Sequence, residues 1–176
     1  FRDVDTTLKT VTIPEGVTRK DIARIIEQKL PEFDTERFLE LTKNNEGYLF
    51  PETYFVPEEF TADEFVALLT ETFASEFALY KEAIAVSPFT EYEVLTLASI
   101  LEREANDEES MRTVSGILQN RLEVGMALQA DATVGYVLDK PIKELQSEDL
   151  EIDTPYNTYL YPGLVPTPIG NPGILA

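Results

Sequence analysis

Cysteine and histidine are both absent from the 176 residues of this chain. Without cysteine the chain has no disulfides, no thiolate metal ligands and no cysteine nucleophile. Without histidine it also lacks the base of a Ser-His-Asp triad, the usual zinc ligand and the commonest general base. Acid–base chemistry must therefore come from aspartate, glutamate, lysine or tyrosine, and we expect neither a metal nor a cofactor.

Basic residues are scarce. Lysine and arginine number 14 against 33 aspartates and glutamates, which leaves a formal net charge of −19. Such a surface repels phosphate backbones, so nucleic acid is not an expected partner, and anionic lipid is avoided unless an anchor holds the chain there. No apolar run approaches the roughly 18–20 residues that span a bilayer, and no signal peptide is visible. Because the chain begins at Phe1 rather than Met, we interpret it as a fragment, with any membrane anchor lying upstream.

Apolar spacing and capping residues predict a mostly helical chain. The alternation over Thr7–Ile13 predicts a strand, and Pro14–Gly16 a turn. Helices are expected where apolar residues recur every three or four positions behind a threonine or aspartate cap. The predicted helical ranges are 18–30, 34–43, 61–80, 91–105 and 110–124, with a short turn at 147–150.

Three ranges are predicted to be irregular: the aromatic 44–57, the polar 128–136 and the proline-rich 153–173. We therefore expect an α+β fold with a small β-α-α portion at 1–45 and a helix-dominated body at 46–176. A long irregular segment with aromatics and little charge, such as 153–173, is typical of a binding wall. A surface meander is the alternative.

Glu102 is the candidate general acid. In the helix predicted for 91–105, apolar side chains at about 100° per residue share one face, and Glu102 lies roughly 40° from Ala98 on that face. Burial raises the pKa of a carboxyl, and a carboxyl still protonated near neutral pH is what a general acid needs. The alternative is a glutamate at the edge of the apolar face that reaches solvent or pairs with a base. Glu104 is expected on the solvated flank of the same helix.

Asp131 is the candidate for a second carboxylate. Glycoside cleavage uses a protonated carboxyl, usually with another carboxylate as nucleophile or as base for a water. Asp131 lies in the polar 128–136 segment, where Gln129, Asp131 and Thr133 alternate and would line one side of an extended strand. Polar loops commonly contain an aspartate, so the pattern alone leaves an ordinary loop open.

Four sequence blocks then point to one family. In chain order they read EGYLFPETY, LASILERE, NRLEVGMALQADATVGY and TPYNTYLYPGL. Together they cover most of the chain, from about Val11 to Gly173, and resemble the endolytic murein transglycosylases of the YceG-like family. In that family the block resembling LASILERE carries the catalytic glutamate at its first acidic position, here Glu102. Its second acid, here Glu104, is then a supporting residue.

The resemblance implies cleavage of peptidoglycan glycan strands from within, without water, leaving a 1,6-anhydro-N-acetylmuramyl end. One glutamate would act first as acid and then as base, while the substrate's own C6 hydroxyl attacks the anomeric carbon. The polar positions that match the family and are expected to hold the glycan are Gln129, Asp131, Thr133, Tyr136, Asn157 and Tyr159. The implied location is the extracytoplasmic face of the bacterial membrane. Cell-wall synthases or divisome proteins are the implied candidate partners.

The chain departs from the family pattern in three places. It reads GLVPTPI over 163–169 where members often read close to GLPPGPI. The family's membrane helix is absent, and at most the tail of its LysM-like module remains before Asn44. The family pattern also leads us to expect a further segment beyond Asn171–Gly173. Two other functions stay open: a non-catalytic wall-binding or scaffold module, and a two-carboxylate muramidase that uses Asp131.

Overall fold

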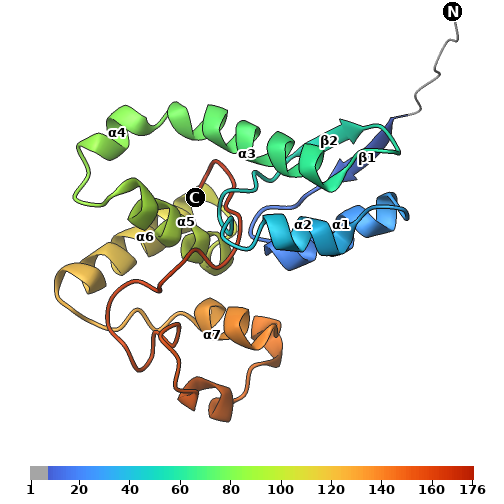
Figure 1. Cartoon of the computed structure of the whole chain (residues 1–176). Helices are drawn as coiled ribbons and strands as arrows, with labels where there is room; N and C mark the ends of the chain where they lie inside the picture. Colours follow the sequence, from blue (N-terminus) through green and yellow to red (C-terminus); the bar gives the residue numbers. More distant parts are fainter. Residues whose placement is uncertain (1–7) are drawn as a thin grey trace, which may run out of the picture.

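The computed structural model describes residues 8–176. Over that range the chain forms seven α-helices and one small sheet, which lies at one end of the molecule beside α1, α2 and α3 (Figure 1). In order, the elements are β1 (Lys9–Thr12), α1 (Arg19–Lys29), α2 (Thr35–Leu41), β2 (Thr53–Val56), α3 (Ala62–Ala78), α4 (Lys81–Ala85), α5 (Glu91–Glu104), α6 (Glu108–Glu123) and α7 (Asp131–Leu138), followed by the 3-10 turns η1 (Ile142–Glu144) and η2 (Ser147–Glu151). The fold is α+β and mostly helical, as predicted.

The sheet is a two-stranded antiparallel pair in which Lys9 lies opposite Val56 and Thr12 opposite Thr53. Strand β2 buries alternate side chains, whereas Phe55 between them is 65% exposed. Helices α1, α2 and α3 contribute to the same core as the strands. The largest fully buried side chains of this core are Val11, Ile13, Ile22, Ile26, Leu30, Phe38, Leu49, Phe65 and Leu69.

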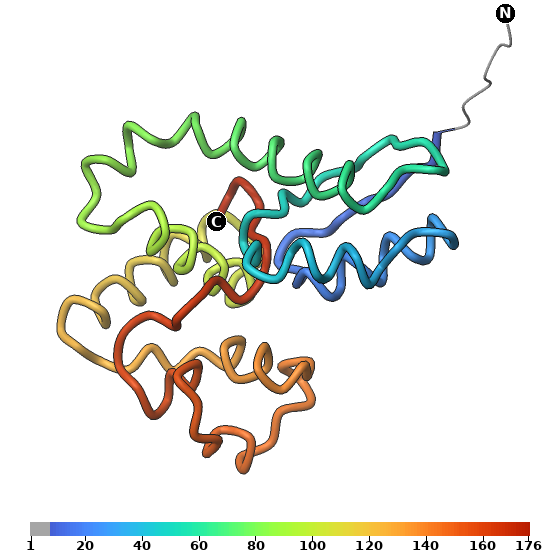
Figure 2. Tube along the Cα trace, viewed as in Figure 1, coloured from blue at the N-terminus to red at the C-terminus, as the bar shows by residue number. Residues whose placement is uncertain are grey.

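A second core joins α5, α6, α7 and the C-terminal segment. Leu97 and Ile100 of α5 pack with Leu118 of α6 and with Ile169 near the chain end. Figure 2 shows the C-terminal segment passing from the α7 side of the molecule back toward α5. There it pairs with the loop after β1, because the Gly16 N–H donates to the Asn171 carbonyl at 2.7 Å and the Asn171 N–H to the Val17 carbonyl at 2.9 Å.

Capping chemistry places the helix starts where the sequence predicts them. Thr18, Thr61 and Thr90 each close a capping box with the acid three residues later. Gly125 follows α6 with φ of 68°, the left-handed conformation expected of a residue after a helix end. The turn predicted at 147–150 is present as η2.

Three elements differ from the sequence predictions. Residues 53–56 form β2 rather than an irregular segment, because β1 supplies a pairing partner far away in the chain. Residues 131–138 form α7, so Gln129, Asp131 and Thr133 do not line an extended strand. Helix α4 interrupts the region between the predicted helices 61–80 and 91–105. Thr7, the first residue of the predicted strand, lies outside the described residues.

Within residues 8–176 no helix combines the length and apolar character required to cross a membrane.

Candidate active site

Helix α5 ends on two glutamates that have different surroundings. Residues two apart on a helix are rotated by roughly 200°, so Glu102 and Glu104 leave α5 in nearly opposite directions. The helix stops there because Ala105 takes an extended conformation, with φ of −143° and ψ of 149°. Each carboxyl must therefore be considered with its own neighbours.

Glu102 is half-buried, and burial is the main cause of the raised pKa of its carboxyl. The charge of Glu15 also raises this pKa, while the hydrogen bond from Gly173 opposes it. That bond, from the Gly173 N–H to Glu102 Oε2, is 2.9 Å long. The environment agrees with the one predicted for Glu102: a carboxyl on the buried side of α5 that is harder to ionise than usual.

Two chain segments enclose Glu102. A Cβ placed on Gly16 would lie 3.1 Å from Glu102 Cγ, and one placed on Gly173 would clash with the Glu15 carboxyl. The carboxyl thus lies between the turn after β1 and the C-terminal segment. Among residues 8–176, Gly173 is the only hydrogen-bond partner of its side chain. The structure does not bring Glu102 into contact with the other predicted site residues.

Glu104 faces the start of α7 instead. The residue as a whole is exposed, but protein atoms crowd its carboxyl enough for burial to be the main cause of a raised pKa. The charge of Asp131 raises that pKa further, and the Ala132 N–H and Arg103 lower it. Glu104 is exposed, as expected for the solvated flank of the helix, but its carboxyl also interacts with the first residues of α7.

Asp131 is held by a tyrosine from the proline-rich segment. The Tyr159 hydroxyl donates to Asp131 Oδ1 at 2.5 Å. Burial and this hydrogen bond raise the pKa of Tyr159 to about 12, so the phenol remains a donor at neutral pH. The charge of Glu104 also raises the pKa of Tyr159, whereas Arg121 lowers it. Two carboxyls and a phenol from α5, α7 and 153–173 therefore interact at one place.

Gln129 and Arg121 border this cluster. The guanidinium of Arg121 donates to the Leu128 carbonyl at 2.5 Å and to Gln129 Oε1 at 3.4 Å, which fixes the loop before α7. Gln129 is exposed and has a φ of 55°, a left-handed conformation that turns the chain into α7. We call Glu104, Arg121, Gln129, Asp131 and Tyr159 the α5–α7 polar cluster.

Two predicted substrate-binding residues lie in the interior. The Thr133 hydroxyl donates to the Ala130 carbonyl at 2.8 Å and lies 3.0 Å from Thr158 Oγ1. The Asn157 amide donates to the Leu150 and Ile152 carbonyls, and its oxygen accepts the Tyr159 N–H at 3.0 Å. Both residues are fully buried, so their polar groups shape the segment that presents Tyr159.

Tyr136 also directs its hydroxyl inward, to Glu46 Oε2 at 3.2 Å. Glu46 and Asn171 were not among the predicted site residues, although Glu46 opens the block EGYLFPETY. Glu46 is 7% exposed, and burial is the main cause of the raised pKa of its carboxyl. A glutamate beside the small, turn-forming Gly47 was the available signal, but its burial depends on Asn171, far away in the chain.

An apolar cavity lies beside the C-terminal segment, with Gly173 in its wall. It measures about 450 Å³ and is bounded mainly by apolar side chains of α3 to α6, including Phe73, Phe77 and Leu101. Neither Glu102 nor Glu104 lines it. In residues 8–176 no group of three acidic side chains converges closely enough to hold a metal ion.

Comparison with known proteins now places the chain. A family model described as the YceG-like family matches residues 2–176. The chain belongs to the YceG-like family. An endolytic murein transglycosylase of Bacillus subtilis (strain 168) is 30% identical to it over 191 residues, which cover 93% of this chain and 53% of the relative. A protein of the same description from Streptococcus pneumoniae (strain ATCC BAA-255 / R6) is 29% identical over 204 residues, covering 95% of this chain and 37% of the relative.

A solved structure shares the fold of this YceG-like chain. The crystal structure of a YceG-like protein from Listeria monocytogenes superposes with a TM-score of 0.87 at 28% sequence identity. The match covers 94% of this chain and 64% of the Listeria chain. The family resemblance read from the four sequence blocks is confirmed. This YceG-like chain spans about half or less of the length of the two curated relatives.

Proposed function

We propose that this YceG-like chain contains the glycan-cleaving site of an endolytic peptidoglycan lytic transglycosylase. The supporting relatives are the endolytic murein transglycosylases that match more than nine-tenths of the chain. The observation that carries the proposal is the α5–α7 polar cluster, where a carboxyl of raised pKa meets a second carboxyl fixed by a phenol. A protonated carboxyl beside a carboxylate is the arrangement that glycoside cleavage requires.

Within that site we assign the general acid to Glu104. The sequence pattern favoured Glu102, but its carboxyl accepts the Gly173 N–H, and the charge that raises its pKa is that of Glu15 rather than Asp131. Glu104 is exposed as a residue, so a glycan strand has access to it, while crowding by protein atoms and the charge of Asp131 both raise the pKa of its carboxyl. Glu102 then supports the fold by holding the C-terminal segment against α5.

The reaction needs one acid that later acts as a base. Protonated Glu104 donates to the β-1,4 glycosidic oxygen between N-acetylmuramic acid and N-acetylglucosamine as the C1–O bond breaks. The resulting carboxylate takes the proton of the muramyl C6 hydroxyl, whose oxygen bonds to C1 and closes the 1,6-anhydro ring. Because the nucleophile belongs to the same sugar, the attack has a high effective molarity and needs no water.

Asp131 suits the role of charge stabiliser in this scheme. Its negative charge raises the pKa of Glu104 before the reaction and would offset the positive charge that develops on the sugar ring during it. The Tyr159 hydroxyl holds it in place. Gln129, exposed beside it, is suited to hydrogen-bond the glycan.

The same geometry supports a second candidate, a muramidase in which Asp131 activates a water or attacks the sugar. Two neighbouring carboxyls are common to both reactions. The products differ: anhydro ends indicate the transglycosylase and reducing ends the hydrolase. A wall-binding module without catalysis would leave no new ends.

The substrate proposed is therefore the glycan strand of peptidoglycan, encountered on the outer side of the membrane. Cell-wall synthases or divisome proteins are proposed partners on family resemblance alone. The acidic surface, with a formal net charge of −19, also disfavours nucleic acid as a ligand.

Mass spectrometry of digested sacculi tests the function, with Glu104→Gln and Glu102→Gln as matched variants. We expect anhydro-muramyl products from the wild type, loss of at least about 10²-fold in rate for Glu104→Gln, and retained cleavage for folded Glu102→Gln. The reverse order would move the acid to Glu102 and leave the function standing. Reducing ends would favour the muramidase, and no cleavage by the folded wild type would refute an enzymatic role.

A further inference from the structure

A buried carboxylate outside the reaction scheme joins three parts of the molecule. Glu46 lies in the loop between α2 and β2, with 7% of its surface exposed. Its Oε1 accepts the Arg19 N–H at 2.9 Å and the Asn171 side-chain amide at 3.0 Å. Its Oε2 accepts the Tyr136 hydroxyl at 3.2 Å. One side chain therefore links the start of α1, the C-terminal segment and α7.

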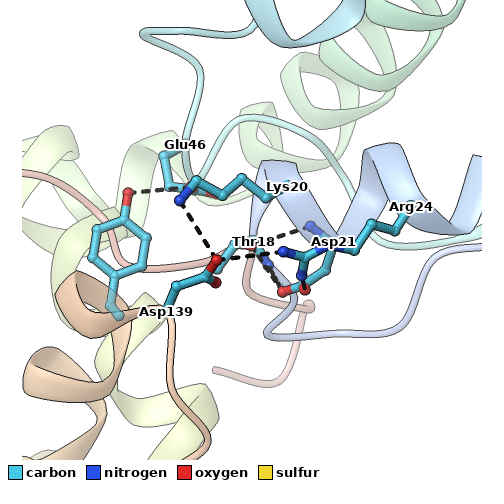
Figure 3. A network of polar contacts seen from close by, with 7 residues as sticks. Thr18, Lys20, Asp21, Arg24, Glu46 and Asp139 are labelled. Carbon is cyan, nitrogen blue, oxygen red and sulfur yellow. Dashed lines mark hydrogen bonds and ion pairs between the residues drawn. The ribbon is translucent and has the colours of Figure 1, made fainter. Parts of the chain in front are cut away.

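Ion pairs make a second link between α1 and α7. Figure 3 shows Lys20 and Arg24 directed at Asp139, which follows the last turn of α7. The distances to Asp139 Oδ2 are 3.7 Å from Lys20 Nζ and 3.3 Å from Arg24 Nη2. These side chains are about half exposed, so each pair contributes little by itself. The Glu46–Tyr136 hydrogen bond, which is less exposed than these ion pairs, is the stronger constraint of the two.

The apolar contacts of α7 lie on its other sides. It packs against α5, η1 and η2, with Ala132 in the core that also holds Leu97 and Ile100. The ring centroids of Tyr136 and Tyr156 lie 5.6 Å apart. The contacts described here between α7 and α1 are polar, and they decide how α7 lies relative to the N-terminal portion.

We propose that Glu46 and Tyr136 are positioning residues for glycan cleavage: their hydrogen bond holds α7 in place and thereby sets Asp131 relative to Glu104. The inference rests on the proposed function. Asp131 is the first residue of α7, about 7.5 Å along the helix axis from Tyr136 at 1.5 Å per residue. A short helix transmits a displacement at Tyr136 directly to Asp131. A shift of about 1 Å at a reacting group can cost roughly 10²-fold in rate.

The chemistry at this point requires an acceptor on residue 46. Three donors converge on it: the Arg19 N–H, the Asn171 amide and the Tyr136 hydroxyl. A carboxylate accepts all three bonds without a donor of its own. Glutamine also fits, since its oxygen can accept the Arg19 and Asn171 donors while its amide donates to the Tyr136 oxygen. Alanine would remove the acceptor of all three hydrogen bonds from a largely buried place, which is costly.

Tyr136→Phe is the deciding variant because it removes the hydroxyl and keeps the ring beside Tyr156. We expect amide hydrogen exchange in residues 131–138 to accelerate roughly fivefold, the factor that one lost hydrogen bond allows. We also expect kcat to fall about tenfold or more with KM little changed, because Asp131 is displaced while glycan contacts remain. Tyr80→Phe, an exposed tyrosine far from α7 in the sequence, is the matched control and should change neither quantity.

Glu46→Gln completes the test as the conservative variant. Its amide hydrogen exchange in residues 131–138 should stay near the wild-type rate, and it should keep most of its activity at neutral pH. Glu46→Ala should show faster exchange and lower activity, or fail to fold. If amide hydrogen exchange in residues 131–138 is unchanged in Tyr136→Phe, the proposal is overturned. Faster exchange with an unchanged kcat also overturns it. If the wild type cleaves no glycan, the proposed function fails, and the exchange of Tyr136→Phe still decides whether the contact holds α7.

Discussion

Glu102 and Glu104 are close in sequence, yet their environments assign them different tasks. Burial raises the pKa of both carboxyls. The nearby charge comes from Glu15 in one case and from Asp131 in the other, and only the second carboxyl shares its surroundings with a fixed phenol. Residue type and helical position are therefore insufficient to identify the general acid. The identity of the neighbouring charged residue, here Asp131 of α7, distinguishes the two glutamates.

The first residue-scale prediction concerns Asp131→Asn. Losing its charge should slow cleavage by roughly 10²-fold, since the positive charge on the sugar is no longer offset. It should also lower the pKa of Glu104, because Asp131 raises it, so the fall of activity with rising pH begins at a lower pH. Initial rates across the pH range measure both effects. Asp153→Asn, which breaks the exposed 2.7 Å contact to Tyr161, is the matched control. A switch to reducing ends would show that Asp131 takes part in the second bond-making step.

The second residue-scale prediction uses the raised pKa of Glu46. A carboxyl whose pKa is higher folded than unfolded binds its proton more tightly in the fold. This tighter proton binding adds to the free energy of unfolding. The added stability is fully present below the ordinary glutamate pKa of about 4.3 and is lost as pH rises through the pKa of the folded state. Glutamine does not titrate, so Glu46→Gln does not lose this stability. The free energy of unfolding of the variant should therefore rise relative to that of the wild type as pH increases. Urea denaturation at several pH values, with exposed Glu27→Gln as control, measures the difference; parallel wild-type and variant profiles would contradict it.

At the scale of elements, glycines show how differently two helices tolerate the same change. A Cβ on Gly116 in α6 would meet no atom within 4 Å, whereas one on Gly135 in α7 would lie 2.8 Å from the Lys140 carbonyl oxygen. The first helix has space on its exposed face. The second is closed by the chain that turns back after Asp139, whose φ is 51°.

We therefore predict opposite effects for two alanine substitutions. Gly116→Ala should stabilise the protein by about 0.5–1 kcal/mol, because alanine is the better helix former. Gly135→Ala should destabilise it by about 1–3 kcal/mol, because the backbone at Lys140 must move, and should also reduce cleavage through α7. Urea denaturation midpoints give the stabilities. Equal effects of the two changes would show that the packing at Gly135 adapts freely.

Helices with strong local signals were predictable from sequence. The helix α5 begins at a capping box that is readable as Thr90 and Glu93, and the same holds for α3 at Thr61. The elements missed are those with weak local signals. Helix α7 begins after Ala130 without a side-chain cap, and α4 also lacks one. Strand β2 is short and exists through its pairing with β1.

At the scale of the whole molecule, the C-terminal segment ties distant parts together. Asn171 is fully buried, and its side-chain oxygen accepts the Gly47 and Leu49 N–H groups, each at 2.9 Å. Its amide donates to the Val17 carbonyl and to Glu46, each at 3.0 Å. A single side chain near the chain end therefore organises the loop before β2 and the turn before α1.

The prediction at this scale is that Asn171→Ala costs at least about 3 kcal/mol in the free energy of unfolding, since it leaves several buried polar groups without partners. Asn120→Ala, at an exposed position of α6, should change it by less than about 0.5 kcal/mol. Denaturation followed by circular dichroism compares them. Near-equal stabilities would mean that water replaces the lost bonds.

The sequence by itself determined the fold class, the helix starts, the family and the set of polar residues from which the site is built, because these depend on periodicity, capping and motif order. It also led to Glu102, a half-buried glutamate of raised pKa near the end of α5. Only the tertiary structure decided which glutamate meets Asp131, that Thr133 and Asn157 face inward, and that Glu46 has a role at all. The physical reason is that burial and pairing arise between residues far apart in the chain, as Asn171 with Glu46 and Tyr159 with Asp131 demonstrate.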